Sequence, residues 1–113
     1  MAELTVVQSV DTQHTEPTGR ALIGGEQCLF GDEVRADDLV LANFDKRDVH
    51  TGGALYLLQS NNGWRGCRWL MAVLDGIAIQ DGRGNCTTVR NMGETNWRVV
   101  GTVETVYRPT RYQ

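Results

Sequence analysis

The side chains that could carry out covalent chemistry are few in this sequence. Its 113 residues include three cysteines, two histidines and a single lysine. The cysteines, Cys28, Cys67 and Cys86, are odd in number and show no Cys-x-x-Cys spacing. Such a set favours neither a disulfide framework nor a zinc site. We therefore expect no metal and no other cofactor, and we interpret the cysteines as buried free thiols.

A thiol hydrolase would need a histidine beside its nucleophilic cysteine. A pair of Cys28 and His50, oriented by an aspartate, fits that chemistry, but no spacing in the sequence requires it. His50 precedes a glycine pair and is more typical of a surface turn, while His14 lies in a polar segment. The adjacent carboxylates at 32–33 and 37–38 would point to opposite faces of a strand, so we interpret them as solvated turns.

The charge of the chain is unevenly distributed. Residues 1–50 carry ten acidic and four basic side chains, whereas residues 51–113 carry four acidic side chains and seven arginines, and the formal net charge is −3. Arginine suits phosphate binding, and Trp64, Trp69 and Trp97 could stack on bases of single-stranded nucleic acid. Because the arginines are spread over several segments, we expect a mixed-charge surface, and binding to nucleic acid by this chain alone is not expected.

Short apolar segments separated by glycine-rich turns indicate the elements that must position these side chains. The turns include Asn62-Gly63, a strong hairpin signal, and Asp75-Gly76. Gly101 is expected to form a bulge or bend. Strands are predicted at residues 39–43, 52–58, 66–74, 77–79, 86–90 and 97–107. Residues 39–41 suit a strand that is buried on both faces, and the whole pattern predicts an all-β fold.

The length and composition indicate one globular domain. No apolar run approaches the length of a membrane span, and no secretory segment opens the chain. We expect a cytoplasmic protein with a flexible arm at residues 1–20 and a single β domain at residues 21–113. Residues 4–7 of the arm could form an edge strand on this domain or on a partner.

Five of these segments, in their order, resemble the C-terminal domain shared by LexA, the phage CI-type repressors and UmuD. The resemblance covers roughly residues 24–111. It implies a curled antiparallel sheet or partly open barrel with little or no helix, and a domain that dimerises. The matching segments are Asp37-Asp-Leu-Val-Leu-Ala-Asn43, Gly52-Gly-Ala-Leu-Tyr56, Cys67-Arg-Trp-Leu70, Asp75-Gly-Ile-Ala-Ile79 and Val99-Val-Gly-Thr-Val103.

The resemblance also indicates where a nucleophile would lie. In LexA and UmuD a catalytic serine lies ten positions before the aspartate of a Gly-Asp turn. If Asp38 is that aspartate, Cys28 takes the position of the serine, and a register one residue away gives Leu29. A cysteine could act there if a neighbouring arginine lowered its pKa, because the thiolate is the reactive form.

The residue that would activate this nucleophile is missing. The family uses a neutral lysine as the base, but Lys46, the single lysine here, lies in a turn between two predicted strands. Alignment on Leu70 places Arg68 at the base position, and one fewer inserted residue places Cys67 there. Arginine stays protonated at physiological pH. The Ser-Lys dyad is therefore absent on either alignment, and Cys28 and Arg68 mark its degenerate positions.

The sequence thus favours a non-catalytic relative of this family that acts in dimerisation or protein interaction. No DNA-reading helix-turn-helix pattern precedes the domain, so we expect a homodimer or a partner of a repressor, as in a prophage or plasmid regulator of transcription. The expected interface lies on the strand at 97–107, with Trp97, Val99, Val103 and Tyr107. The alternatives are a self-cleaving peptidase that uses Cys28 and cuts within residues 20–24 of the arm, and a small β-barrel that binds single-stranded nucleic acid.

Overall fold

The computed structural model describes residues 17–110, and the described part consists of seven strands and two short 3-10 helices. The predicted all-β fold is confirmed. In chain order the elements are β1 (Arg20–Gly24), η1 (Gly25–Gln27), β2 (Leu39–Asn43), β3 (Ala54–Ser60), β4 (Arg65–Val73), β5 (Gly76–Gln80), β6 (Cys86–Val89), η2 (Met92–Glu94) and β7 (Trp97–Tyr107).

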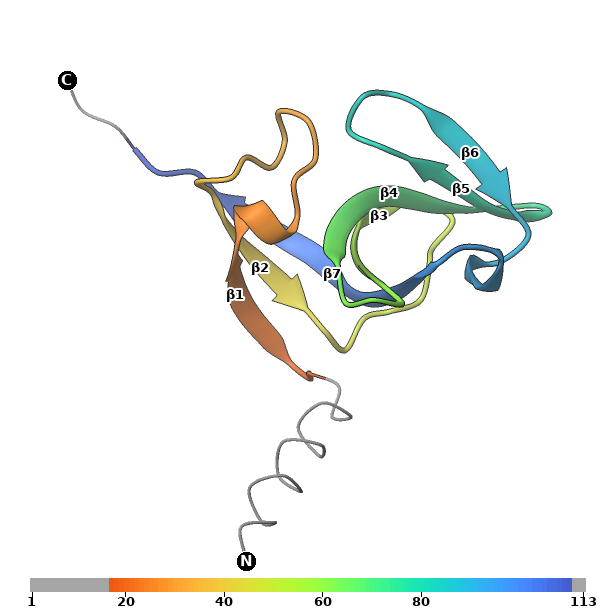
Figure 1. The fold of residues 1–113 in the computed structure, drawn as a ribbon, viewed down its shortest axis with the longest axis horizontal. Helices are drawn as coiled ribbons and strands as arrows, with labels where there is room; N and C mark the ends of the chain where they lie inside the picture. The colour runs from red at the N-terminus through yellow and green to blue at the C-terminus, as the bar shows by residue number, and fades with distance from the viewer. Residues whose placement is uncertain (1–16, 111–113) are drawn as a thin grey trace, which may run out of the picture.

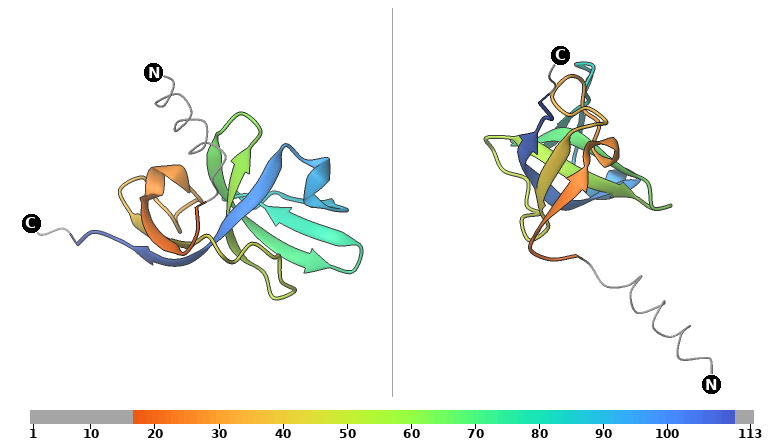
Figure 2. Two further views of the ribbon diagram at one scale, coloured as in Figure 1. Left: turned by 90° about the horizontal axis from the view of Figure 1, so that it is seen from below. Right: turned by 90° about the vertical axis from the view of Figure 1, so that its left-hand side faces the viewer.

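All seven strands belong to one antiparallel sheet in the order β1-β2-β7-β3-β4-β5-β6. The sheet curls strongly about β3, β4 and β7 and is not closed, so β1 and β6 lie at its two edges (Figures 1 and 2). The hairpin of β5 and β6 projects to one side, and β1, β2 and η1 form the other side (Figure 1). The result is a curled sheet, as predicted.

Strand β3 is the centre of the core because its alternate side chains enter two separate apolar clusters. Leu55 and Leu57 pack in a larger cluster with residues from β2, β4, β7 and the segment after η1. Tyr56 and Leu58 pack on the other face with Leu70 and side chains from β5, η2 and β7. A strand flanked by partners on both sides and apolar on both faces is what the glycine-entered run at 52–58 predicts.

Strand β7 joins the two halves of the sheet, pairing with β3 through its first half and with β2 through its second half. Its register shifts twice, opposite Leu57/Leu58 and opposite Leu41/Ala42. Gly101 lies at the first shift, which confirms the predicted bulge. A Cβ atom at Gly101 would lie 3.0 Å from the Asn43 carbonyl oxygen and 3.3 Å from the Cα of Phe44, so glycine permits the close approach of β2.

Two expectations for the first part of the chain are wrong. Residues 20–24, which the peptidase alternative placed in the arm as a cleavage segment, form β1, which pairs with β2 along all five residues. Strand β2 is not buried on both faces, since β1 and β7 cover its edges but only one of its faces meets the core. Val40 and Ala42 are fully buried, whereas Leu39 is 49% exposed.

The expectation that both Asp37 and Asp38 are solvated is also wrong for Asp38, which is 2% exposed. Its carboxylate accepts hydrogen bonds from the Arg35 backbone N–H (2.8 Å) and from the Arg108 guanidinium (3.0 and 3.1 Å). Arg108 also donates to the backbone oxygen of Asp32 (2.9 Å). A carboxylate can be buried when it is paired in this way. The ion pair between Asp38 and Arg108 connects the segment between η1 and β2 to the end of β7.

Candidate functional site

The structure brings Cys28 together with Cys67 and not with Arg68. Cys28 follows η1, Cys67 lies in β4, and both side chains are fully buried in the larger core cluster, where their thiols interact. Arg68 and Leu70 alternate with Cys67 and lie on the opposite face of β4. The structure therefore does not bring together Cys28 and Arg68, the two positions that the resemblance gave for the degenerate dyad.

The two thiols have different electrostatic environments. Contact with the Cys67 thiol lowers the pKa of Cys28, and the positive charge of Arg65 lowers it further. The same contact and burial raise the pKa of the Cys67 thiol far above its usual range. Cys67 therefore stays protonated and cannot serve as a general base. The pair lacks the neutral amine that the family's dyad requires.

The Arg68 side chain makes structural contacts on its own face of β4. Its Nη1 donates to the backbone oxygen of Cys67 (2.7 Å), and its guanidinium lies over the Trp97 ring, 5.9 Å from the ring centre. Arg65 lies two residues before Cys67 on β4 and therefore shares the face of Cys67. Its Nη1 donates to Gln27 Oε1 (3.2 Å), and its guanidinium lies 5.8 Å from the centre of the Phe44 ring. Arg65 is therefore the arginine that acts on Cys28.

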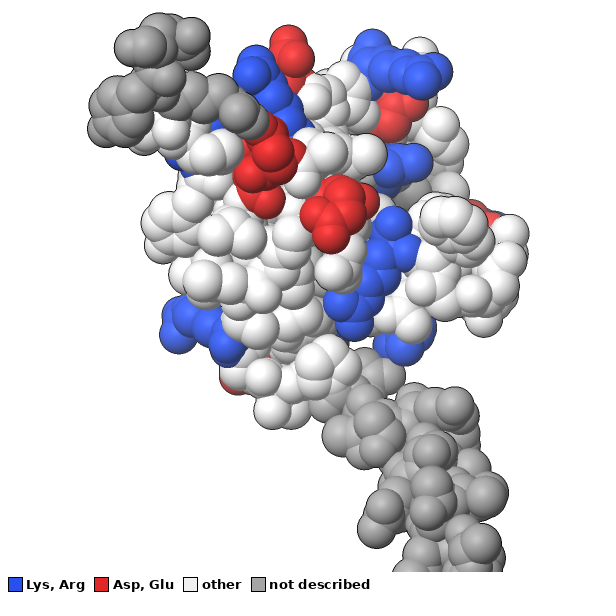
Figure 3. All heavy atoms as spheres, turned by 60° about the vertical axis from the view of Figure 1, so that its left-hand side comes forward, with Lys and Arg blue, Asp and Glu red and all other residues white. Residues whose placement is uncertain are grey.

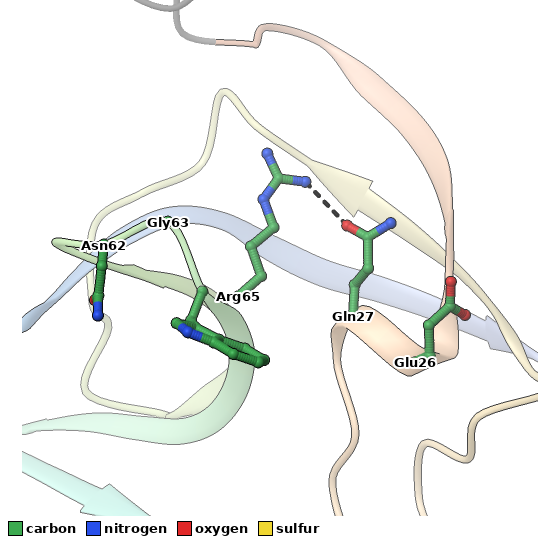
Figure 4. Close-up of a pocket in the computed structure, with 6 residues that line it drawn as sticks. Glu26, Gln27, Asn62, Gly63 and Arg65 are labelled. Carbon is green, nitrogen blue, oxygen red and sulfur yellow. Dashed lines mark hydrogen bonds between the residues drawn. The ribbon is translucent and has the colours of Figure 1, made fainter.

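A hollow of about 390 Å³ opens between η1 and the β3–β4 hairpin, and its lining includes Gln27, which precedes Cys28, and Arg65. In Figure 4 the Arg65 side chain reaches across toward Gln27, and Asn62 and Gly63 form the hairpin side. The Glu26 carboxylate points away from Arg65. Arg65 and Gln27, joined by their hydrogen bond, both line this hollow.

A second candidate site is the outer face of β1, β2 and β7. On these strands Ile23, Val40 and Val106 pack into the core, so by strand alternation their neighbours point outward. Leu22 is paired with Leu41, and Leu39 with Tyr107. We call Leu22, Leu39, Leu41 and Tyr107 the outer patch; Leu41 is half-buried, and the other three are 57%, 49% and 50% exposed.

A compensated polar network borders the outer patch. Arg20 and Glu104 form an ion pair with Nε and Oε1 2.6 Å apart, Asn43 donates to Glu104 Oε2 (3.0 Å), and Lys46 Nζ lies 3.9 Å from Glu104. The hydrogen bond from Arg20 lowers the pKa of Glu104. Figure 3 brings the β1 side of the molecule forward and shows a broad uncharged area bordered by acidic and basic groups. The outer patch is thus apolar at its centre.

The four predicted interface residues do not share one face. Trp97 and Val99 pack against the cluster around Tyr56, whereas Val103 packs against the larger cluster. The two bulges in β7 put Val103 out of step with Val99 and Tyr107. Tyr107 alone belongs to the outer patch. A role of the other three in an interface stays a prediction.

Other expected sites are placed as follows. Cys86 is exposed, so the interpretation of all three cysteines as buried thiols is wrong for it, while it is confirmed for the other two. His50 is exposed, as expected of a surface turn, and His14 lies outside the described residues, as do residues 4–7. Among the tryptophans, Trp69 and Trp97 pack against the core clusters and Trp64 is 72% exposed.

The outer patch was missed because its members are separated in the sequence and only the strand register joins them. The alternation of β2 contained a signal, since Leu39 and Leu41 must face away from Val40 and Ala42.

In residues 17–110 no helix has both the length and the apolar character to cross a membrane. No model of a known protein family, no curated protein and no solved structure matches this chain. The resemblance to the LexA-type domain therefore stays a prediction from its motifs.

Proposed function

We propose that this chain is a non-catalytic interaction domain that dimerises through the outer patch. The observation that carries the proposal is an apolar surface on a sheet face that no described residue covers. Three of its side chains are about half exposed or more. Antiparallel sheets usually present polar side chains on a face toward water, and contiguous apolar patches mark interaction sites.

A second copy of the chain is the occupant that the charges favour. The acidic and basic groups at the border of the outer patch are already paired with each other through Glu104. The Glu104 network therefore adds no uncompensated charge when two copies meet at this face, whereas the Glu26 carboxylate, which lies over Gly24 on the same face, would stay at the edge of the contact. A two-fold axis would pair the patch with itself, as in most homodimers. The four apolar side chains would form the core of that interface and the Glu104 network its polar rim.

The proposal includes a relationship to the LexA, CI and UmuD domain with loss of its catalytic dyad. An open, curled antiparallel sheet supports it. Cys28 also meets Cys67, which takes the base position on one of the two alignments, although the pair predicted from the sequence was Cys28 and Arg68. A buried thiol beside a second protonated thiol has no general base. Lys46 lies in an exposed turn near Glu104. A chain of this kind would exchange into the dimer of a LexA-type repressor, in the manner of a prophage or plasmid regulator. Native mass spectrometry of a mixture of the two purified proteins would detect the mixed dimer.

Sedimentation equilibrium of the purified chain tests self-association. The variant Leu22→Lys places a charge at the centre of the outer patch. We expect its dissociation constant to rise about tenfold or more, as at the apolar core of an interface. Leu74→Lys is the matched control, because Leu74 is 98% exposed in the turn between β4 and β5 and outside the patch. Equal association of the wild type and both variants would contradict the proposal, as would a monomeric wild type at millimolar concentration.

The two alternatives receive less support from the same structure. A peptidase with Cys28 as its nucleophile needs that thiol to reach a substrate, and Cys28 is 0% exposed. Its proposed cleavage segment is the paired strand β1. A single-strand binder needs several stacking surfaces, and two of the three tryptophans are packed in the core clusters. An intact mass after incubation at alkaline pH and a binding titration at low salt test these alternatives.

A further inference from the structure

The contact between Cys28 and Cys67 joins the turn after η1 to strand β4, beside the hydrogen bond between Gln27 and Arg65. Cys28 ends the turn after η1 at one side of the sheet, and Cys67 lies in the middle of the β3–β4 pairing. Both thiols are fully buried in one apolar cluster and interact with each other. Two reduced thiols in contact are the starting point for a disulfide, and nothing in the proposed interaction function makes use of them.

The surroundings provide a route by which a small oxidant could reach the pair. Gln27 precedes Cys28 directly, and Arg65 shares a face of β4 with Cys67; both line the hollow of about 390 Å³ shown in Figure 4. The hydrogen bond between them is 3.2 Å long and joins two half-buried side chains. Movement of the Arg65 side chain, which is also held by a hydrogen bond to Gln59 Oε1 (3.3 Å) and by its contact with the Phe44 ring, would give a small oxidant an approach from the hollow to the cysteines. The positive charge of Arg65 also favours a thiolate at Cys28.

We propose that Cys28 and Cys67 form a reversible intramolecular disulfide when the protein meets a hydroperoxide. The Cys28 thiolate attacks the terminal peroxide oxygen, the O–O bond breaks, and the other oxygen takes a proton and leaves as water from hydrogen peroxide or as an alcohol from an organic hydroperoxide, which gives a sulfenic acid at Cys28. The Cys67 sulfur then attacks the Cys28 sulfur, the S–O bond breaks, and the sulfenic oxygen leaves with the Cys67 proton as water. Two thiols are oxidised by two electrons and one hydroperoxide is reduced; a dithiol reverses the reaction.

Cys86 provides an internal comparison. It is exposed on the edge strand β6, so it reacts as an isolated surface thiol. In an unfolded chain the shortest loop between two cysteines is the one between Cys67 and Cys86, and shorter loops close at a lower entropic cost. A disulfide that joins Cys28 to Cys67 instead would therefore report the folded arrangement.

The experiment treats the full-length wild type and the Cys86→Ser variant with hydrogen peroxide under native conditions, followed by alkylation, intact mass measurement and peptide mapping without reduction. We expect Cys86→Ser to lose two hydrogen atoms in mass without taking up the alkylating reagent, and both proteins to yield one linked peptide pair that contains Cys28 and Cys67. The same treatment in urea should give the wild type a mixture that includes the link between Cys67 and Cys86. Because Cys86→Ser alters only an exposed side chain, the fold is kept.

Three results would overturn the inference. One is a native wild type linked through Cys86 as in urea, and another is accumulation of oxygen atoms on Cys28 without a link. The third is full alkylation of Cys28 and Cys67 after a peroxide treatment that has oxidised Cys86. None of these outcomes depends on dimerisation, so the inference and the proposed function can fail separately.

Discussion

Replacing Gly101 with alanine tests whether the bulge in β7 sets the packing of the sheet. Gly101 is buried where β7 passes from β3 to β2. An alanine Cβ there would lie 3.0 Å from the Asn43 carbonyl oxygen and 3.3 Å from both Cα and Cδ1 of Phe44. Two of these three atoms are backbone atoms, one in the last residue of β2 and one in the residue that follows it. Pairing of β2 with β1 and β7 and the hydrogen bond from Phe44 N–H to the Gly19 oxygen (2.8 Å) keep them from retreating freely.

Two opposing effects determine how much Gly101→Ala changes the free energy of unfolding. Overpacking a well-packed site costs about 1–3 kcal/mol. The backbone of Gly101 lies outside the left-handed region, so alanine adds no strain in φ, and the loss of freedom in the unfolded chain stabilises the variant by about 0.4–1 kcal/mol. The overpacking term is larger, and we expect Gly101→Ala to lower the free energy of unfolding by about 0.5–2 kcal/mol.

Urea unfolding followed by tryptophan fluorescence measures this change. Gly52→Ala is the matched control, because a Cβ at Gly52 meets no atom within 4 Å and its φ is not positive. The control retains only the unfolded-state effect, so its free energy of unfolding should stay equal or rise by about 0.4–1 kcal/mol. The reasoning is refuted if Gly101→Ala is as stable as Gly52→Ala, since the close approach of β2 would then have no energetic consequence.

Two further predictions concern polar contacts. The Arg108 guanidinium lowers the pKa of Asp38. The stabilisation by the ionised Asp38 is therefore present above its unfolded pKa of about 3.9 and is lost as pH falls through the lower folded pKa. Asp38→Asn should be less stable than the wild type at pH 7, and a difference between their urea midpoints that stays the same at pH 3 would contradict this. Tyr56→Phe removes a donor to the Asp48 backbone oxygen (2.9 Å) and an acceptor for the His50 N–H (3.1 Å), so it should cost about 1–2 kcal/mol. Faster amide exchange at His50 would accompany that loss, and unchanged exchange would speak against the contact.

Much of the sheet could be predicted because its turns and apolar runs are local signals. Asn62-Gly63 lies at the β3–β4 hairpin, with Gly63 at a φ of 90°, and the run at 97–107 coincides with β7. Gly101 interrupts a β-branched run, which is typical of a bulge. Strand β1 was missed because residues 20–24 gain their order from pairing with β2, and nothing in five residues specifies that partner.

The candidate sites depended on long-range geometry and could be predicted only in part. Cys28 was identified by its position before Asp38, but the choice between Cys67 and Arg68 as its neighbour required the register of β4. The burial of Asp38 depends on Arg108, a partner that lies seventy residues later in the chain. Alternation along β2 made Leu39 an outward residue, yet its neighbours in the outer patch come from two other strands.

The most direct test of the proposed dimer is an isotope-filtered NMR experiment on a mixture of labelled and unlabelled chains. It detects contacts between protons of different molecules only. We predict intermolecular contacts among the methyl groups of Leu22, Leu39 and Leu41 and the ring of Tyr107, at concentrations where the protein sediments as a dimer. A dimer whose intermolecular contacts arise from other faces, such as the β5–β6 hairpin, would contradict the proposal, and so would the absence of any intermolecular contact.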